Sequence, residues 1–201
     1  MKAESVAFTV AGMCFGIILG WVLATQDASR ASLSLPAAAP AAAPAATGQQ
    51  QPPPLDEARV KTLQAAIEKD PKNPANYAQL GNAYFDAQQF PSAIDAYERS
   101  LKLNANDADV STDLGVSYFY INRTDEALAQ FEHSLKISPN HTKTLLNKGI
   151  VLAFGKENLE AAAREWKRVV ELAPDSPEGQ RARQALEGVE AAHARQGTTN
   201  Q

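Results

Sequence analysis

Apolar and polar residues divide the chain into three stretches with different patterns. Residues 6–24 form an apolar run of 19 residues without a charged side chain. Residues 31–54 are rich in alanine, proline and glutamine. From Leu55 onward, apolar residues recur at every third or fourth position, which is the spacing of amphipathic helices. The pattern therefore predicts an all-helical region over residues 55–195, preceded by a linker and by a segment long enough to be a membrane helix.

Inside the helical region, one arrangement of small and aromatic residues occurs three times. Its first part places a glycine ahead of a larger side chain: Gly81 and Tyr84, Gly115 and Tyr118, Gly149 and Leu152. Its second part places an alanine ahead of an aromatic residue: Ala93 and Tyr97, Ala127 and Phe131, Ala162 and Trp166. The glycines recur at intervals of 34 residues, and each copy has room for two short helices.

The glycines predict close packing between the two helices of each copy. Glycine in a helix interior costs about 1 kcal/mol relative to alanine, which indicates a packing reason for keeping it. The alanines are expected to be the matching small residues on the facing helix. The aromatic residues are expected to fill the space between neighbouring hairpins.

This period, with a proline near the end of most copies, resembles the tetratricopeptide repeat (TPR), in which each copy is a pair of antiparallel helices. The resemblance implies an all-α TPR helical-hairpin solenoid, here with an N-terminal transmembrane helix, whose first helices line a concave groove. The expected segments are a membrane anchor at residues 1–30 with its helix at about residues 6–24, a linker at 31–54, a flanking helix at 55–73, three repeats at 74–107, 108–141 and 142–176, a C-terminal capping helix at 177–195 and a disordered tail at 196–201.

The TPR resemblance also implies which residues line the peptide-binding groove. They are Asn82, Phe85, Thr112, Val116, Phe119, Tyr120, Leu146, Asn147, Ile150 and Phe154. Because Tyr118, Phe119 and Tyr120 are consecutive, they cannot all face one direction. At least one of them is expected to be exposed towards the groove or the adjacent hairpin. The alternative interpretation places the groove residues in the core between tightly stacked repeats.

Some TPR domains hold the C-terminal carboxylate of a partner with a set of lysine and asparagine residues. Ala78 stands where the first lysine of that set would be, and only Asn82, Lys143 and Asn147 are compatible with it. The groove residues are instead mainly apolar and aromatic. They favour a partner that offers an amphipathic helix or a short extended peptide with apolar anchors.

The apolar run at residues 6–24 has two interpretations. As an uncleaved anchor, it is just long enough to span a hydrocarbon core of about 30 Å. As a secretory signal peptide, it would be cleaved after Ala24. Gly12, Gly16 and Gly20 lie on one face of this helix, which favours close contact with another membrane helix. Lys2 ahead of the run favours a cytoplasmic N-terminus, with the repeats on the other side of the membrane.

Composition and candidate chemistry change this picture little. The 19 basic and 23 acidic residues do not favour nucleic acid as a partner. His133, His141 and His193 have no metal-binding spacing, and the chain has one cysteine. Because a phosphate-binding loop and a nucleophile motif are also missing from the sequence, we expect no catalytic, cofactor or metal site and a protein that is not an enzyme.

The function predicted from these features is a membrane-tethered TPR scaffold that binds a peptide or helix of a protein partner. Ala162, Trp166 and residues 172–178 also resemble the membrane-anchored TPR components of bacterial cytochrome c maturation. That resemblance implies an envelope assembly pathway and a bacterial inner membrane. Lys2 and the linker then predict a single-pass protein with its repeats in the periplasm. The alternative is a structural subunit of a membrane complex, or a homo-oligomer, that associates through the convex face or the glycines of the membrane helix.

Overall fold

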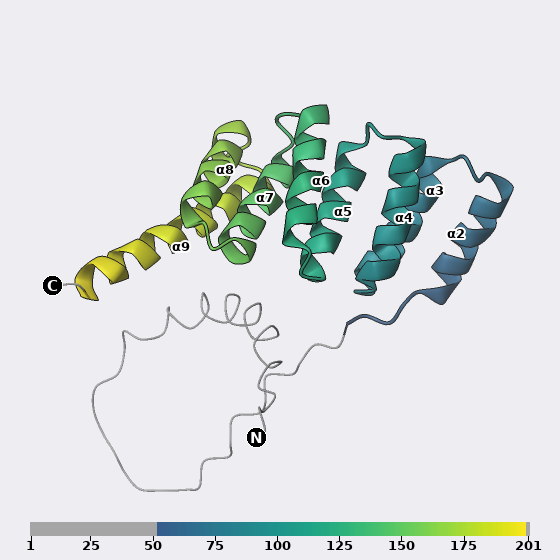
Figure 1. Ribbon diagram of the computed structural model, residues 1–201, viewed down its shortest axis with the longest axis horizontal. Coiled ribbons are helices and arrows are strands. Elements are labelled where there is room, and N and C mark those ends of the chain that lie inside the picture. Colours follow the sequence, from purple (N-terminus) through teal and green to yellow (C-terminus); the bar gives the residue numbers. More distant parts are fainter. Residues whose placement is uncertain (1–51, 200–201) are drawn as a thin grey trace, which may run out of the picture. The chain divides into compact units, whose positions relative to one another are not determined.

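The computed structural model describes residues 52–199 of the 201-residue chain and the side chains of residues 52–191. This part of the chain contains eight α-helices and no strand. They are α2 (Glu57–Lys69), α3 (Pro74–Asp86), α4 (Phe90–Leu103), α5 (Ala108–Tyr120), α6 (Thr124–Ile137), α7 (Thr142–Gly155), α8 (Leu159–Leu172) and α9 (Pro177–Thr199). Figure 1 shows them following one another in a row from α2 to α9. The prediction of an all-helical fold is confirmed for this region.

The predicted membrane helix and the predicted tail lie at the two ends of the chain. The predicted membrane helix, with Gly12, Gly16 and Gly20, lies outside the described residues. Among the helices that the structure describes, none is both long enough and apolar enough to cross a membrane. α9 continues to Thr199, four residues beyond the predicted end of the capping helix at residue 195. The alanine, arginine and glutamine residues before Thr199 favour helix.

Three pairs of consecutive helices pack as hairpins: α3 with α4, α5 with α6, and α7 with α8. A Cβ atom on Gly81 would lie 2.5 Å from the ring of Tyr97, and one on Gly115 would lie 2.6 Å from the ring of Phe131. Gly149 faces the indole ring of Trp166 in the same way. The predicted close packing at the glycines is therefore confirmed. The aromatic rings, however, occupy space within their own hairpins, because the missing side chains leave room for them there.

The turns inside the hairpins share an uncommon backbone conformation. Gln88, Asn122 and Glu157 have φ angles of 57°, 62° and 53°. This left-handed region is unfavourable for residues with a Cβ atom, although asparagine tolerates it better than most. Each hairpin therefore reverses direction at a residue with a positive φ, and two of these residues are poorly suited to it.

Two apolar cores and one polar cluster hold the hairpins together. Tyr97 and Phe131 belong to a core shared by the first two hairpins, and Trp166 belongs to a core shared by the third hairpin and α9. Where the second hairpin meets α7, three fully buried side chains form a hydroxyl cluster: Thr112, Ser134 and Thr144. The Thr144 hydroxyl lies 2.6 Å from that of Thr112 and 2.8 Å from that of Ser134. This junction thus depends on hydrogen bonds as well as on apolar contacts.

α2 packs on α3 as a second helix that has no first helix of its own among the described residues. Its buried residues, Val60 and Leu63, contact Ala83 of α3. Arg59 stands 34 residues before Ala93, the fully buried alanine at the contact inside the first hairpin. Its guanidinium forms a 3.1 Å ion pair with Asp86 at the end of α3. At this end of the row, a charged side chain therefore occupies the position that alanine takes inside the hairpins.

Candidate functional site

The predicted groove residues belong to α3, α5 and α7, the first helices of the three hairpins. We call the surface carried by Asn82, Phe85, Val116, Phe119, Tyr120, Asn147, Ile150 and Phe154 the first-helix face. Asn82 is exposed, and its side-chain oxygen accepts a 2.8 Å hydrogen bond from the hydroxyl of Tyr97. Burial raises the pKa of Tyr97, and the charges of Asp113 and Asp86 raise it further. Asn82 thus lies near acidic side chains, and its hydrogen bond to Tyr97 connects it to the core of the first hairpin.

An aromatic cluster joins the first two hairpins and consists of Phe85, Phe90 and Tyr120. The rings of Phe90 and Tyr120 are stacked, with centroids 4.3 Å apart and planes inclined by 5°. Phe85 meets them edge-on at 5.5 and 5.9 Å. Tyr120 nevertheless remains 44% exposed. The expectation that at least one residue of the aromatic run faces the adjacent hairpin is confirmed, because Tyr120 contacts Phe90 of α4.

The remaining predicted residues on this face differ in exposure. Val116 and Phe119 are half-buried and pack against the core of the first two hairpins. Ile150 is half-buried against the core of the third hairpin. The side-chain amide of Asn147 donates a 2.8 Å hydrogen bond to the Lys143 carbonyl. Phe154, at 50%, is the most exposed of the large apolar side chains that the structure describes.

Thr112 and Leu146 were expected in the groove, and the structure contradicts both assignments. Thr112 is fully buried in the hydroxyl cluster, and its hydroxyl donates a 2.7 Å hydrogen bond to the Ala108 carbonyl. Leu146 is buried, and its carbonyl accepts a 3.2 Å hydrogen bond from the indole of Trp166. Both side chains point into contacts between helices, so neither can touch a partner. For these two residues, the alternative interpretation as core residues is correct.

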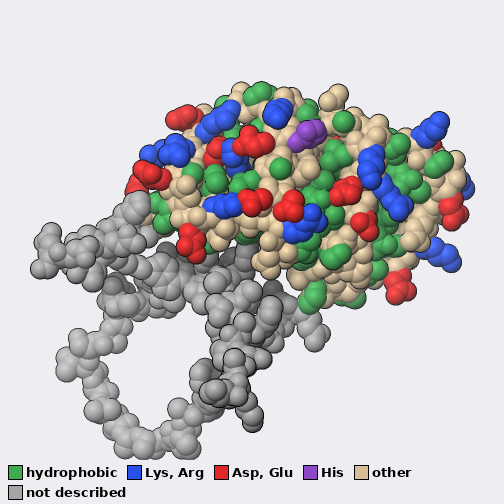
Figure 2. All heavy atoms as spheres, viewed as in Figure 1, with side chains coloured by type: hydrophobic (Ala, Val, Ile, Leu, Met, Phe, Trp, Pro, Cys, Tyr) green, Lys and Arg blue, Asp and Glu red, His purple; other side chains and the backbone are tan. Residues whose placement is uncertain are grey.

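Carboxylates beside the first-helix face are paired with basic side chains from other helices. Lys143 of α7 lies 2.7 Å from Asp113 of α5, and His141 lies 3.3 Å from Asp109. Burial raises the pKa of Asp113; Lys143 opposes that shift without cancelling it. On the one face that Figure 2 shows, basic and acidic side chains are interspersed. Lys143, one of the residues compatible with carboxylate binding, is therefore already engaged by Asp113.

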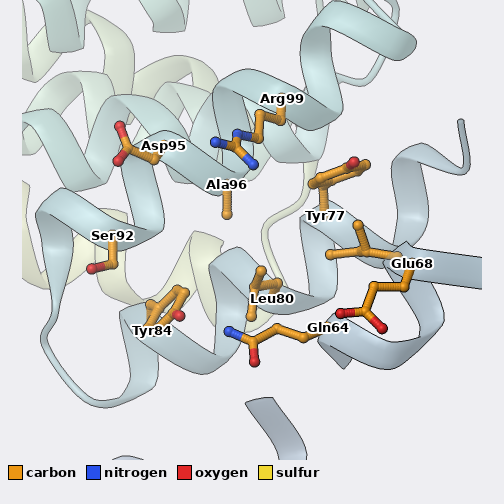
Figure 3. A pocket seen from close by; sticks show the side chains of 10 residues that line it. Gln64, Glu68, Tyr77, Leu80, Tyr84, Ser92, Asp95, Ala96 and Arg99 are labelled. Carbon is orange, nitrogen blue, oxygen red and sulfur yellow. The ribbon is translucent and has the colours of Figure 1, made fainter. Parts of the chain in front are cut away.

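A cavity of about 410 Å³ lies between α2, α3 and α4, away from the predicted groove residues. In Figure 3, Leu80 and Tyr84 of α3 lie on one wall, and Asp95, Ala96 and Arg99 of α4 lie above them on the other. None of the predicted groove residues lines this cavity. No motif in the sequence predicts this cavity, because it arises from the spacing between α2 and α4.

The described residues contain no arrangement suited to metal binding or nucleophilic catalysis. No group of three or more His, Cys, Asp or Glu side chains in this region could hold a metal ion. His133 contacts the hydroxyl of Ser111, and His141 contacts that of Thr144. Both hydroxyl groups belong to fully buried side chains, so a substrate could not reach them. The side chain of His193 lies outside the described part.

Comparison with protein families identifies the repeats. A TPR repeat model matches residues 81–121, and a tetratricopeptide repeat model matches residues 108–141. Residues 81–141 therefore contain tetratricopeptide repeats, and the described helices form an all-helical, TPR solenoid-like fold. No curated protein sequence matches the chain.

Solved structures support the same fold. The first TPR of Spaghetti (RPAP3), bound to the HSP90 peptide SRMEEVD, aligns with a TM-score of 0.56 and 24% identity over 62% of this chain and 96% of that one. The first TPR domain of human RPAP3 aligns with a TM-score of 0.56 and 23% identity over 64% and 98%. MamA aligns with a TM-score of 0.52 and 26% identity, but the match covers only 61% of the MamA chain and 56% of this one. These matches give no support to the narrower resemblance to cytochrome c maturation components.

Proposed function

We propose that this protein is a scaffold that holds a peptide or helix of a partner protein on its first-helix face. The observation that carries the proposal is the pair of exposed aromatic side chains, Tyr120 and Phe154, at the ends of adjacent first helices. Aromatic side chains supply much of the binding energy at protein interfaces because they bury a large area with few rotatable bonds. The Spaghetti structure supports the same use of the fold, since a TPR there holds a peptide.

A peptide suits this surface better than a small molecule does. The cavity between α2, α3 and α4, of about 410 Å³, lies outside the first-helix face. A second cavity, of about 260 Å³, is lined by residues of α8 and α9 and also lies outside it. The face itself consists of separated apolar side chains on three helices, which an extended or helical segment can contact one after another. We therefore infer that the partner contributes a segment of chain with apolar anchors.

The proposal can be tested by replacing the two exposed aromatic residues, with circular dichroism to confirm that the variant is folded, because Tyr120 also stacks on Phe90. A Tyr120→Ser/Phe154→Ser variant removes the two exposed aromatic side chains from the face. A Leu103→Ser/Leu172→Ser variant is the matched control, because these leucines are 42% and 40% exposed at the ends of second helices. In a crosslinking pull-down from native membranes, partner proteins should be lost with the first variant and retained with the control. Equal recovery with both variants would contradict the proposal.

We further propose that residues 6–24 tether the repeats to a bacterial inner membrane, with the repeats in the periplasm. The support is the uncharged apolar run and Lys2 ahead of it. Protease added to spheroplasts should then remove the repeats, and full protection would reverse the orientation. N-terminal sequencing of the native protein separates an anchor from a cleaved signal peptide, since cleavage after Ala24 leaves Thr25 first. Envelope assembly, including cytochrome c maturation, is the setting in which we would test partners first.

The cavity between α2, α3 and α4 favours a second candidate function, a structural subunit that docks outside the first-helix face. Ser92 lines this cavity, and a Ser92→Trp replacement would fill part of it. Loss of partner proteins with Ser92→Trp, together with their retention in the Tyr120→Ser/Phe154→Ser variant, would favour the structural subunit. Association through Gly12, Gly16 and Gly20 of the membrane helix remains a separate proposal, tested by Gly16→Ile in the full-length protein.

A further inference from the structure

Carboxylates surround the predicted peptide-binding surface on α3 and α5. Asp86 and Asp109 are both well exposed, with 66% and 71% of their side-chain surface accessible. Asp113 of α5 keeps 25% of its side-chain surface accessible and contacts Lys143 of α7, and its charge helps to raise the pKa of the Tyr97 hydroxyl that is bonded to Asn82. Asp107, which caps the start of α5, adds a fourth carboxylate close enough to act on Asp113.

Two of these four carboxylates are paired with a permanent cation. Arg59 is paired with Asp86 at 3.1 Å, and Lys143 is paired with Asp113 at 2.7 Å. The basic partner of Asp109 is a histidine, and the Asp107 side chain accepts the hydrogen bond that caps α5. The pKa of Asp113 stays raised by burial despite Lys143, so its ionised form is incompletely compensated.

This arrangement disfavours an acidic partner segment for two reasons. A carboxylate approaching Lys143 would have to displace Asp113, which already occupies that ammonium group at 2.7 Å. It would also meet the exposed charges of Asp86 and Asp109, and like charges brought together at an interface are costly. A cationic segment, in contrast, would gain an interaction with exposed Asp109, and it could contact the second oxygen of Asp113 without displacing Lys143, which contacts Oδ1.

We propose that the partner segment is cationic as well as apolar: lysine or arginine side chains contact Asp109 and Asp113 while apolar side chains contact Tyr120 and Phe154. This inference rests on the proposed function and specifies its partner. The surface would therefore prefer a basic segment, whereas the Spaghetti TPR binds the HSP90 peptide SRMEEVD, which contains acidic residues.

Two designed peptides provide the test. Both are labelled with fluorescein and carry leucine at every third or fourth position; one has four lysines between the leucines and the other has four glutamates. Binding to the full-length protein in detergent is measured by fluorescence anisotropy at pH 7.5. We expect the lysine peptide to bind at least about tenfold more tightly at low salt, with the difference shrinking at about 0.5 M salt because screening weakens charge interactions.

Charge variants assign that preference to named side chains. Asp109→Asn/Asp113→Asn should weaken binding of the lysine peptide by at least about threefold, which is the effect of losing two partly exposed ion pairs. The control Glu171→Gln/Asp175→Asn changes the net charge equally at two exposed sites elsewhere and should leave binding unchanged. Lys143→Gln, which frees Asp113, should tighten binding. Circular dichroism confirms that each variant is folded.

The outcomes separate this inference from the proposed function. If both peptides bind equally and both lose affinity in the Tyr120→Ser/Phe154→Ser variant, the surface binds peptides without the proposed charge preference, and only the inference is wrong. If the control weakens lysine-peptide binding as much as Asp109→Asn/Asp113→Asn does, the attraction comes from net charge and the inference also fails. Binding of the lysine peptide that does not depend on Tyr120 and Phe154 contradicts both, and failure of both peptides to bind overturns the inference.

Discussion

Gly115→Ala adds one methyl group at the contact between α5 and α6. The new Cβ atom would lie 2.6 Å from Cε1 of Phe131 and 3.0 Å from the carbonyl oxygen of Ala127. Both neighbours are fixed, because Phe131 and Ala127 are fully buried and the oxygen belongs to the backbone. The helix can accept the methyl group only if α5 and α6 move apart.

The expected magnitude is the difference between two opposing effects. Replacing a mid-helix glycine by alanine stabilises a helix by about 1 kcal/mol. Overpacking a core costs about 1–3 kcal/mol when neighbours cannot move, and occasionally more. We expect a net destabilisation of up to about 2 kcal/mol, which lowers the melting temperature of a domain of this size by up to about 8 °C.

Thermal and urea denaturation, followed by circular dichroism, measure the effect. Gly188→Ala is the matched control, because a Cβ atom on Gly188 of α9 would have no neighbour within 4 Å. The control should be as stable as the parent chain or more stable. Phe131→Leu should tolerate Gly115→Ala better than the parent does, giving a coupling of at least about 0.5 kcal/mol in the double-mutant cycle. If Gly115→Ala is as stable as Gly188→Ala, the explanation of the repeated glycines by close packing is wrong.

Three further predictions follow from the backbone, the charges and the hydroxyl cluster. Gln88→Gly and Glu157→Gly should each raise the unfolding free energy by about 0.5–1 kcal/mol, because both positions have a positive φ; a loss of stability in urea denaturation would refute this. Asp113→Asn should be at least as stable as the parent at pH 7 and should lose this advantage below about pH 4. The reason is that folding raises the pKa of the Asp113 carboxyl. Such a group stabilises the fold below its unfolded pKa, and this contribution is lost as the pH rises through the folded pKa. Denaturation at pH 3.5 and pH 7 tests the sign, and a variant less stable than the parent only at pH 7 would show that the ion pair with Lys143 dominates. Thr144→Val should cost about 1–3 kcal/mol, because it removes a buried hydroxyl from its partners, whereas Thr62→Val on the exposed side of α2 should have little effect in the same thermal denaturation experiment.

The sequence was sufficient for the helical fold and for the packing of the glycines. The 34-residue period indicates which residues face each other inside a hairpin. The sequence alone therefore predicts the close contacts that the structure shows at Gly81, Gly115 and Gly149. The period does not distinguish contacts within a hairpin from contacts between hairpins. The placement of Tyr97 and Phe131 against their own glycines therefore had to come from the structure.

The candidate site was only partly predictable, because exposure depends on which neighbour covers each position. Equivalent positions in successive repeats suggested that Thr112 and Leu146 were on the surface, yet α6 and α8 contribute the atoms that bury them. Phe90 was missed because it opens the second helix of its hairpin and lies outside the positions that the TPR resemblance assigns to the groove. Its stacking on Tyr120 depends on the relative placement of two hairpins, which a single period does not specify.

Arg59 bears on how copies of this chain can associate. The end of a helical solenoid resembles the surfaces buried inside it, so an uncapped end can join the opposite end of another copy and grow into a filament. Such growth at α2 would require an incoming helix to pack where Arg59 replaces the buried alanine of the hairpins. The incoming helix would have to bury the guanidinium or break its ion pair with Asp86, and burying a charge is expensive. Arg59 therefore disfavours packing of another copy against the α2 end and so disfavours head-to-tail polymerisation.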